Sequence, residues 1–466
     1  MIKFSFPKPQ MRKFSKDAQT DKSLRHSTYD GMAFAAMSGG GETYFTAFAL
    51  FLKATSSQIA IISTLPALIG SLAQLAAIWL DDHIPRRKPL IIFGATLQAC
   101  IWIPIAMLAL LVTDHAIAFL LLLLTVYFAA GNLTTPPWIS LMGDIVPESK
   151  RGRYFAYRTA MISIVTFASL AITGILLNFS EKTGFTWLGF SVVFTMMFFY
   201  RMVSVYHLGA MHEPELHHGT QMQTPDLEFL SRNHALWFSA YFILMQLAVA
   251  IASPFFAVYM LEVLKFSYFE FMVNTGTVVL MQFITLNWWG RISDIFGNRL
   301  ILTITGIIIP MMPVLWIVSD NFWYLLCIQA LAGLAWGGFN LSAGNLLYDL
   351  VPAKQRTTYV AVHNVLAAFG VFIGGMAGAI LLHWVPAQYP WLGSVVHATP
   401  LLSVFLISTL ARAVVSGIFL RKIRELKKPR RSLNTEKLVF RLTRFNAFLG
   451  IRYEPVATVT TTEDNK

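Results

Sequence analysis

Long apolar runs separated by short polar segments make up most of this chain from position 31 onward. Each run has the length of roughly 20 residues that an α-helix needs to cross the hydrocarbon layer of a bilayer. The pattern therefore predicts an all-α polytopic membrane protein with an even set of crossings. The predicted spans are 31–53, 57–80, 89–112, 116–141, 155–177, 186–210, 236–264, 268–290, 300–319, 322–347, 359–384 and 398–420.

Positive charge falls almost entirely on one side of these runs. Of the 36 Lys and Arg residues, all but five lie in the two tails or in every second connection, and the exceptions are Lys53, Lys182, Lys265, Arg201 and Arg412. Cytoplasmic loops of membrane proteins carry this excess of positive charge. We therefore expect both termini in the cytoplasm, in an inner (plasma) membrane of bacterial type.

The composition leaves little material for a soluble domain. Apolar residues form 56% of the 466 positions, and the formal net charge is +12. We attribute this charge to membrane topology and to contact with an anionic inner leaflet, and we expect no nucleic-acid partner. Cys100 and Cys327 both lie in apolar runs, so the sequence suggests no disulfide framework.

One polar connection divides the chain into two halves. We expect a cytoplasmic tail, a first six-helix bundle, a cytoplasmic linker, a second six-helix bundle and a basic cytoplasmic tail. These segments are 1–30, 31–210, 211–234, 235–420 and 421–466. In the last segment, apolar residues recur at helical spacing beside basic ones, which predicts an amphipathic helix on the inner leaflet. They are Leu438, Leu442, Phe445 and Leu449.

The two halves resemble each other at a separation of about 210 positions. The segment Asp144-Ile-Val-Pro147 returns as Asp349-Leu-Val-Pro352. Further matched pairs are Leu52-Lys53 with Leu264-Lys265, Arg201 with Arg412, and Asp82 with Asp294. Several independent pairs at nearly one offset indicate a duplication of six spans with the same orientation.

The segment Gly290-Arg-Ile-Ser-Asp-Ile-Phe-Gly-Asn-Arg299 resembles the G-x-x-x-D-x-x-G-x-R signature of the major facilitator superfamily. A degraded first copy lies at Asp82 to Lys88, with Ile78 and Pro85 at its two glycine positions. The resemblance implies two pseudo-symmetric bundles of six helices with a central site, working by alternating access. It also implies a monomer.

The same resemblance implies a latch between the bundles on the cytoplasmic face. Glycines in such a loop permit close approach and tight turning, and an aspartate there pairs with arginine or helix amides. The alternative role for these charges is the determination of topology. The latch residues would be Gly290, Arg291, Asp294, Gly297 and Arg299, with Asp82 and Arg87 as a weaker counterpart.

Glu42 is the main candidate for chemistry. It lies near the middle of the run 31–53 and directly follows Gly39-Gly40-Gly41, which would loosen the helix or admit a neighbour closely. An ionised carboxylate at that depth costs at least about 3 kcal/mol, so such residues are usually functional. We interpret Glu42 as a proton-coupling carboxylate or as the counter-ion of a cationic substrate. The alternative is a protonated glutamate bonded to an Asn or Gln across the bundle.

Other polar residues inside apolar runs are further candidates. The resemblance favours residues of the first, fourth, seventh and tenth spans as substrate contacts, although each could instead bond to a neighbouring helix. They are Thr43, Thr46, Tyr127, Asn132, Gln246 and Asn340. We favour Arg201 and Arg412 as framework residues bonded to helix carbonyls, with pairing of Arg201 to Glu42 or a substrate anion as the alternative. His363 is a second titrating candidate, for which we favour a hydrated structural role.

We expect a secondary transporter for a small organic solute, coupled to protons. The sequence shows no nucleotide-binding glycine loop, metal-ligand cluster or nucleophile–base pair, so we predict neither an enzyme nor a cofactor, and the proton gradient would drive transport. Import of a polar metabolite and efflux of a lipophilic cation both remain open. The alternatives from other classes are a non-transporting sensor and a lipid flippase or passive facilitator.

Overall fold

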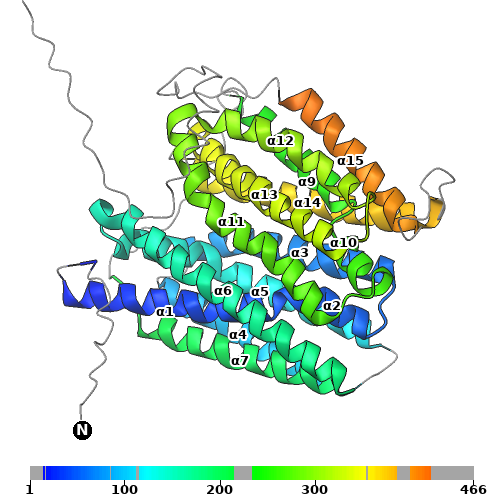
Figure 1. Ribbon diagram of the computed structural model, residues 1–466. Coiled ribbons are helices and arrows are strands. Elements are labelled where there is room, and N and C mark those ends of the chain that lie inside the picture. The colour runs from blue at the N-terminus through cyan, green and yellow to red at the C-terminus, as the bar shows by residue number, and fades with distance from the viewer. Residues whose placement is uncertain are drawn as a thin grey trace, which may run out of the picture.

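The computed structural model describes residues 14–15, 17–83, 86–111, 115–214, 234–352, 355–385 and 399–420, apart from the side chains at 81–83 and 357. Within these ranges every regular element is a helix. The basic tail from 421, with its predicted amphipathic helix, lies outside the described residues, and so does the Asp82 side chain. Figure 1 shows the N-terminal helices, blue to green-cyan, beside the C-terminal ones, green to orange.

The first half follows the predicted order of spans. Its elements are α1 (Ala18–Gly40), η1 (Glu42–Tyr44), α2 (Phe45–Phe51), α3 (Ser56–His83), α4 (Arg87–Leu108), α5 (Ala116–Ile145), η2 (Glu148–Lys150), α6 (Arg151–Lys182) and α7 (Thr186–Ala210).

The second half repeats this order. Its elements are α9 (Ala235–Ala250), α10 (Phe255–Val258), the π-helix η3 (Tyr259–Val263), α11 (Tyr268–Phe296), α12 (Asn298–Leu315), α13 (Phe322–Leu350), α14 (Arg356–Trp384) and α15 (Pro400–Phe419). Among the described residues, eleven helical segments are long and apolar enough to cross a membrane. The remaining predicted span, 31–53, is the broken helix formed by α1, η1 and α2.

The internal repeat is visible in the backbone. Lys53 and Lys265 both adopt left-handed conformations, with φ of 63° and 54°, where the first span of each half ends. Few non-glycine residues have positive φ, so the agreement supports the duplication read from the sequence. Both first spans are also interrupted at related points, after Gly40 in one half and before Phe255 in the other.

The first helix begins earlier than the predicted start of its span at position 31. The Asp17 carboxylate accepts a hydrogen bond of 2.8 Å from the Thr20 amide and caps α1. Because a capped N-terminus satisfies otherwise unpaired amides, the helix continues through the polar stretch that the sequence pattern places in the tail. Asp30 consequently lies inside α1 and is buried.

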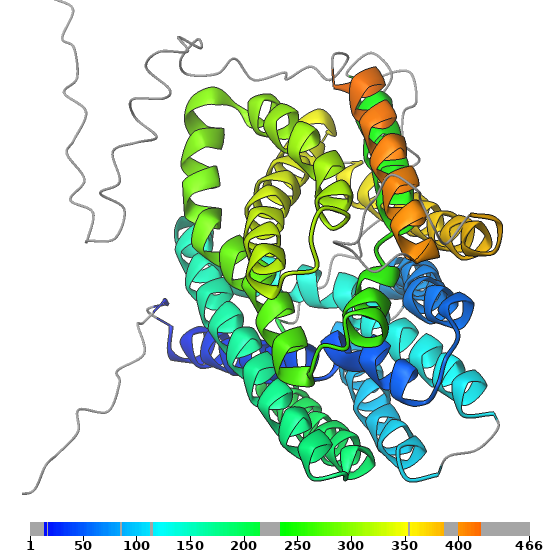
Figure 2. The same cartoon turned by 45° about the vertical axis from the view of Figure 1, so that its right-hand side comes forward.

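The two halves meet mainly along two helix pairs, α3 with α14 and α6 with α11, and α10 also contacts α2 and α3. In both views α11 runs beside α6 (Figures 1 and 2). Near the end of the molecule that holds Lys53 and Lys265, which the predicted topology places outside and which we call the outer end, one buried apolar cluster contains side chains from both halves. It includes Phe48 and Ile59 from the first half and Phe255 and Tyr259 from the second. The bundles are therefore joined by a common core at the outer end.

At the opposite end, which the predicted topology places in the cytoplasm and which we call the cytoplasmic end, each half has its own apolar core. One cluster contains residues of the first half, such as Leu24, Leu141 and Met211. A separate cluster contains residues of the second half, such as Leu302 and Tyr359. Among the described residues, no buried apolar cluster joins the two halves at this end.

Candidate functional site

Glu42 lies at the break in the first span, where α1 ends at Gly40 and a 3₁₀ turn begins. Its side chain is half-buried. The Tyr127 hydroxyl on α5 donates a hydrogen bond of 2.7 Å to the Glu42 carboxylate. The partner is therefore a tyrosine, whereas the alternative interpretation of Glu42 had named an Asn or Gln.

The glycines before Glu42 allow neighbouring helices to approach closely. A Cβ atom at Gly40 would stand 2.5 Å from the Ser169 hydroxyl oxygen of α6, and one at Gly41 would overlap the Trp102 ring of α4. Neither contact leaves room for a side chain. The triple glycine thus ends α1 and also lets this helix pack closely against α6. This packing fixes the position of Glu42 along the bundle.

Aromatic rings surround the Glu42–Tyr127 pair as packed core. The Trp102 ring stacks on Phe45 at 5.2 Å and meets Tyr127 edge to face at the same distance. All three side chains are buried. The rings therefore fill space behind the carboxylate.

Two buried polar atoms next to this pair have no hydrogen-bond partner among the described residues. They are Oε1 of Gln98, which lies beside the Tyr127 hydroxyl, and Nε1 of Trp102. A buried polar group without a partner typically costs about 1–3 kcal/mol, and such groups in native proteins usually bind water or a ligand. The neighbourhood of Glu42 therefore has unused hydrogen-bonding capacity.

Arg201 lies near Glu42 without bonding to it. Its guanidinium donates to the Ser204 hydroxyl at 2.7 Å and lies 4.9 Å above the Phe34 ring. The group is close enough to interact electrostatically with Glu42. The described contacts thus differ from the direct pairing that the sequence left open.

Arg412 makes framework contacts in the second half. Its guanidinium donates to the Ser408 hydroxyl and to the carbonyl oxygens of Ile309 and Val249. These are the helix-carbonyl bonds that we favoured from the sequence.

The remaining cavity candidates are dispersed. Thr43 and Thr46 are half-buried on the same broken span as Glu42, and the Asn132 amide bonds to the Phe128 carbonyl of its own helix. Oε1 of Gln246 is buried without a partner among the described residues, whereas Asn340 is exposed. Among these candidates, the described hydrogen bonds bring together only Glu42 and Tyr127.

His363 is buried, in contrast to the hydrated role that we favoured. Its Nδ1 lies 2.9 Å from the Ser239 hydroxyl, and its ring contacts Phe242 at 5.0 Å. Ser239 also bonds to the Tyr359 hydroxyl. These contacts hold α14 against α9.

The predicted latch residues occupy the cytoplasmic turns. Gly297 has φ of 84° and is the residue between α11 and α12, which agrees with tight turning. A Cβ atom at Gly290 would have no described atom within 4 Å, so no described residue approaches that glycine closely in this conformation. Arg291, Asp294 and Arg299 are exposed beside this turn.

Arg87 is fully buried and makes its contacts within the first half. It donates to the Asp144 carboxylate at 2.6 Å and to the Ser140 hydroxyl at 2.9 Å, and its backbone amide donates to Glu213 at 2.7 Å. These bonds tie α4 to the end of α5 and to the segment after α7. In this conformation the described partners of Arg87 hold one bundle together.

The sequence profile of the Major Facilitator Superfamily matches residues 31–285 and 238–458, which together cover most of the chain. The chain belongs to the Major Facilitator Superfamily. The two overlapping matches agree with the duplicated halves.

Curated relatives within the superfamily match only in part. The vacuolar membrane amino acid uptake transporter fnx2 of Schizosaccharomyces pombe is 31% identical over 116 residues, which are 25% of this chain and 19% of that protein. The multidrug resistance protein MdtG of Proteus mirabilis is 28% identical over 152 residues, which are 32% of this chain and 37% of that protein. The matched stretches thus span well under two thirds of these relatives.

Solved structures of superfamily members match over most of the chain. A bacterial homolog of the human lysosomal transporter Spinster, in an inward-facing and occupied conformation, gives a TM-score of 0.67 at 14% identity, covering 87% of this chain and 97% of that one. A mutant of the nucleoside transporter NupG gives a TM-score of 0.65 at 13% identity, and the match covers 86% of this chain and 100% of that one. At such identities the likeness shows the superfamily fold alone.

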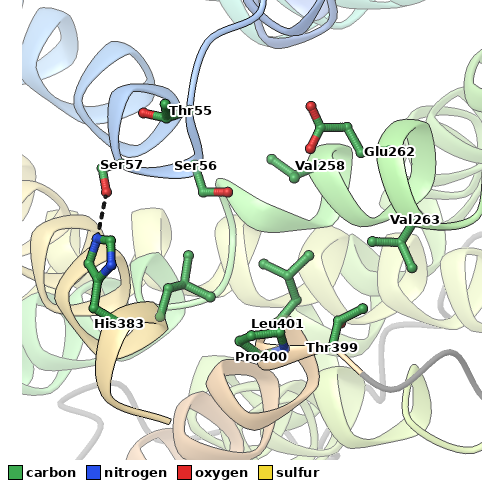
Figure 3. Close-up of a pocket in the computed structure, with 11 residues that line it drawn as sticks. Thr55, Ser56, Ser57, Val258, Glu262, Val263, His383, Thr399, Pro400 and Leu401 are labelled. Carbon is green, nitrogen blue, oxygen red and sulfur yellow. Dashed lines mark hydrogen bonds between the residues drawn. The ribbon is translucent and has the colours of Figure 1, made fainter. Parts of the chain in front are cut away.

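A pocket of about 450 Å³ lies between the halves at the outer end of this superfamily fold. Figure 3 shows Ser57 of α3 facing His383 of α14, and Glu262 of η3 on the opposite wall. The Ser57 hydroxyl and the His383 ring lie 3.4 Å apart. None of the predicted site residues lines this pocket.

The sequence reasoning missed the most buried acidic residue near Glu42. Asp30 is 5% exposed and contacts side chains of α6 and α7. The sequence pattern places it in the tail because it precedes the apolar run. The signal that reveals the longer helix is the capping pattern of Asp17 and Thr20, well before Asp30.

Proposed function

We propose that the protein is a secondary transporter that moves a small organic solute by alternating access, with Glu42 as its proton-coupling carboxylate. The observation that carries the proposal is the Glu42–Tyr127 pair at the break of the first span. Interrupted helices at corresponding positions of two repeats point to the transport site in many transporters. Both first spans of this chain are interrupted in that way.

The packing of the halves supports alternating access. A common apolar core closes the outer end, while separate cores occupy the cytoplasmic end. We interpret this arrangement as an inward-facing conformation. Rocking of the two bundles would open the outer end and close the cytoplasmic end. Such a switch is possible because packed interfaces of this kind change between discrete arrangements.

The site chemistry favours a solute with hydrogen-bonding groups. The unpartnered Gln98 and Trp102 atoms beside Glu42 supply an acceptor and a donor. The neighbouring aromatic rings are packed against one another and are not free to enclose a cation. A polar solute is therefore our first candidate, and efflux of a lipophilic cation, with Glu42 as counter-ion, is the second.

The proposal also covers the membrane in which the protein lies, its topology and its oligomeric state. We propose a monomer in a bacterial inner membrane with both termini in the cytoplasm and an anionic leaflet on that side. No further cofactor is needed, because a proton gradient would supply the driving force.

Reconstitution into liposomes tests the coupling role. We expect wild-type protein to accumulate radiolabelled solute from a screened metabolite pool when a pH gradient is imposed, and to lose accumulation with an uncoupler. Glu42→Gln should abolish accumulation but retain solute exchange, because the amide keeps the shape of the carboxyl and cannot release a proton. The measurement is gradient-driven uptake beside counterflow.

The matched control is Glu148→Gln, which alters an exposed glutamate of η2. It should retain both activities. If the Glu42→Gln variant accumulated solute to the same level as the wild type, the coupling role of Glu42 would be contradicted. Uptake by the wild type that never exceeds equilibrium would instead indicate a passive facilitator, and no uptake or exchange of any solute would favour a sensor.

A further inference from the structure

A second charged cluster lies in the first bundle between Glu42 and the cytoplasm. Asp30 of α1 accepts a hydrogen bond of 2.6 Å from the Ser204 hydroxyl of α7, and Ser204 in turn accepts one of 2.7 Å from Arg201. Arg158 of α6 approaches the other Asp30 oxygen at 3.7 Å. Three helices thus meet at one buried carboxylate.

This cluster is buried too deeply to be ordinary surface charge. Asp30 is 5% exposed and Arg201 is 3% exposed. Removing charges from water is costly unless they are paired. The pairing around Arg201 is nevertheless incomplete, because its buried Nε has no hydrogen-bond partner among the described residues.

Arg201 lies between the two acidic residues of α1. It is within electrostatic range of both Asp30 and Glu42. Met197, one turn earlier on α7, fills the space next to Gly40 and Gly41, directly before Glu42. The Phe34 ring under the Arg201 guanidinium belongs to the stretch of α1 between Asp30 and Glu42. Arg201 therefore lies beside the stretch of α1 that separates the two carboxylates, linked to Asp30 through Ser204 and within electrostatic range of Glu42.

We propose that Asp30 is a positioning residue for proton coupling: through Ser204 it holds Arg201 beside Glu42 and offsets part of the arginine charge that Glu42 experiences. This inference rests on the proposed function of Glu42. The Arg201 cation favours the deprotonated form of Glu42, and the Asp30 anion weakens that effect. Asp30 thereby sets the pH range in which Glu42 exchanges its proton.

Other titratable groups face the cluster from the neighbouring helices. Tyr154 and Arg158 face Asp30 from α6, and Tyr127 faces Glu42 from α5. His26 is one turn before Asp30 on α1 and contacts His207 of α7, with 2.9 Å between their Nδ1 atoms. These groups stay unchanged when Asp30 or Arg201 is substituted, so they contribute equally to every profile that is compared.

The test is the pH dependence of gradient-driven uptake in proteoliposomes. Asp30→Asn removes the compensating anion, so the midpoint of the pH profile should move to lower pH by about one unit. Arg201→Gln removes the cation, so the midpoint should move to higher pH by a similar amount. Asp30→Glu, which keeps the charge, should stay close to the wild type. A residue with a purely structural role would lower the rate without these opposite shifts.

Two exposed residues provide matched controls. Asp17→Asn changes the same residue type on the same helix, and asparagine caps a helix as well as aspartate does. Arg153→Gln changes an exposed arginine at the start of α6. Neither should move the midpoint.

The double variant Asp30→Asn/Arg201→Gln should return the midpoint close to the wild-type value, because both charges are removed together. If Asp30→Asn alone does not insert, comparison of the double variant with Arg201→Gln still isolates the removal of the Asp30 charge, and the midpoint of the double variant should be the lower of the two. Unchanged midpoints in the two single variants, or midpoints that shift in the same direction, would overturn the inference. Loss of coupling in Glu42→Gln together with unshifted profiles would refute only the role of Asp30, whereas retained coupling in Glu42→Gln would refute the proposed function itself.

Discussion

Gly41 lies where the broken first span packs directly against the Trp102 ring of α4. A Cβ atom there would overlap the Trp102 ring and would also crowd the Met37 carbonyl. Gly41→Ala should therefore destabilise the folded protein by about 2 kcal/mol, the usual cost of overpacking. It should also displace Glu42 from Tyr127. Thermal unfolding in detergent, followed by tryptophan fluorescence, measures the first effect.

Gly143 of α5 is the control for this substitution. No described atom lies within 4 Å of its Cβ position, and it is exposed within a helix. Alanine there should leave the stability unchanged or raise it by up to about 1 kcal/mol, since alanine favours helix more than glycine does. Equal effects of the two substitutions would contradict the packing role of Gly41.

The Glu42 site could be predicted from the sequence only in part. A lone acidic residue after three glycines in an apolar run is recognisable, and so is the repeat marked by Lys53 and Lys265. The partner could not be predicted, because Tyr127 reaches Glu42 only through the packing of α1 and α5. Asp30 was missed because the polarity of residues 1–30 concealed a helix that depends on the cap at Asp17.

The contact between α3 and α14 allows the closed outer end to be locked. A Cβ atom at Gly375 would lie 3.6 Å from the Thr64 Cβ, within the range of about 3.5–4.5 Å that a disulfide requires. Thr64→Cys/Gly375→Cys should therefore cross-link on oxidation, in a background with Cys100 and Cys327 replaced. Because the outer ends must separate during alternating access, oxidation should stop uptake and a reducing agent should restore it.

The two single-cysteine variants are the controls for this cross-link. Each should transport equally well in oxidising and reducing conditions. Uninhibited transport by the fully cross-linked protein would show that α3 and α14 do not separate at this level during the cycle.

The proposed orientation of the whole molecule rests on its charge distribution and is open to a direct test. Gly184, between α6 and α7, should lie outside, and Glu148, between α5 and α6, should lie inside; both are exposed. Single cysteines at these positions should therefore differ in reaction with a membrane-impermeant maleimide. In intact cells only the cysteine at 184 should be labelled, and permeabilisation should expose the one at 148. The reverse pattern would invert the proposed topology.

The arrangement of the three apolar cores also bears on biogenesis. Among the described residues, the buried members of the first-half core at the cytoplasmic end all lie at or before Met211, so this core can form as soon as that half has left the ribosome. Phe48 and Ile59, in contrast, complete their packing only when Phe255 and Tyr259 have been synthesised and inserted. A nascent first half is consequently left with an unfinished outer surface, which makes this end of the molecule the place where a membrane chaperone would be needed until the second half arrives.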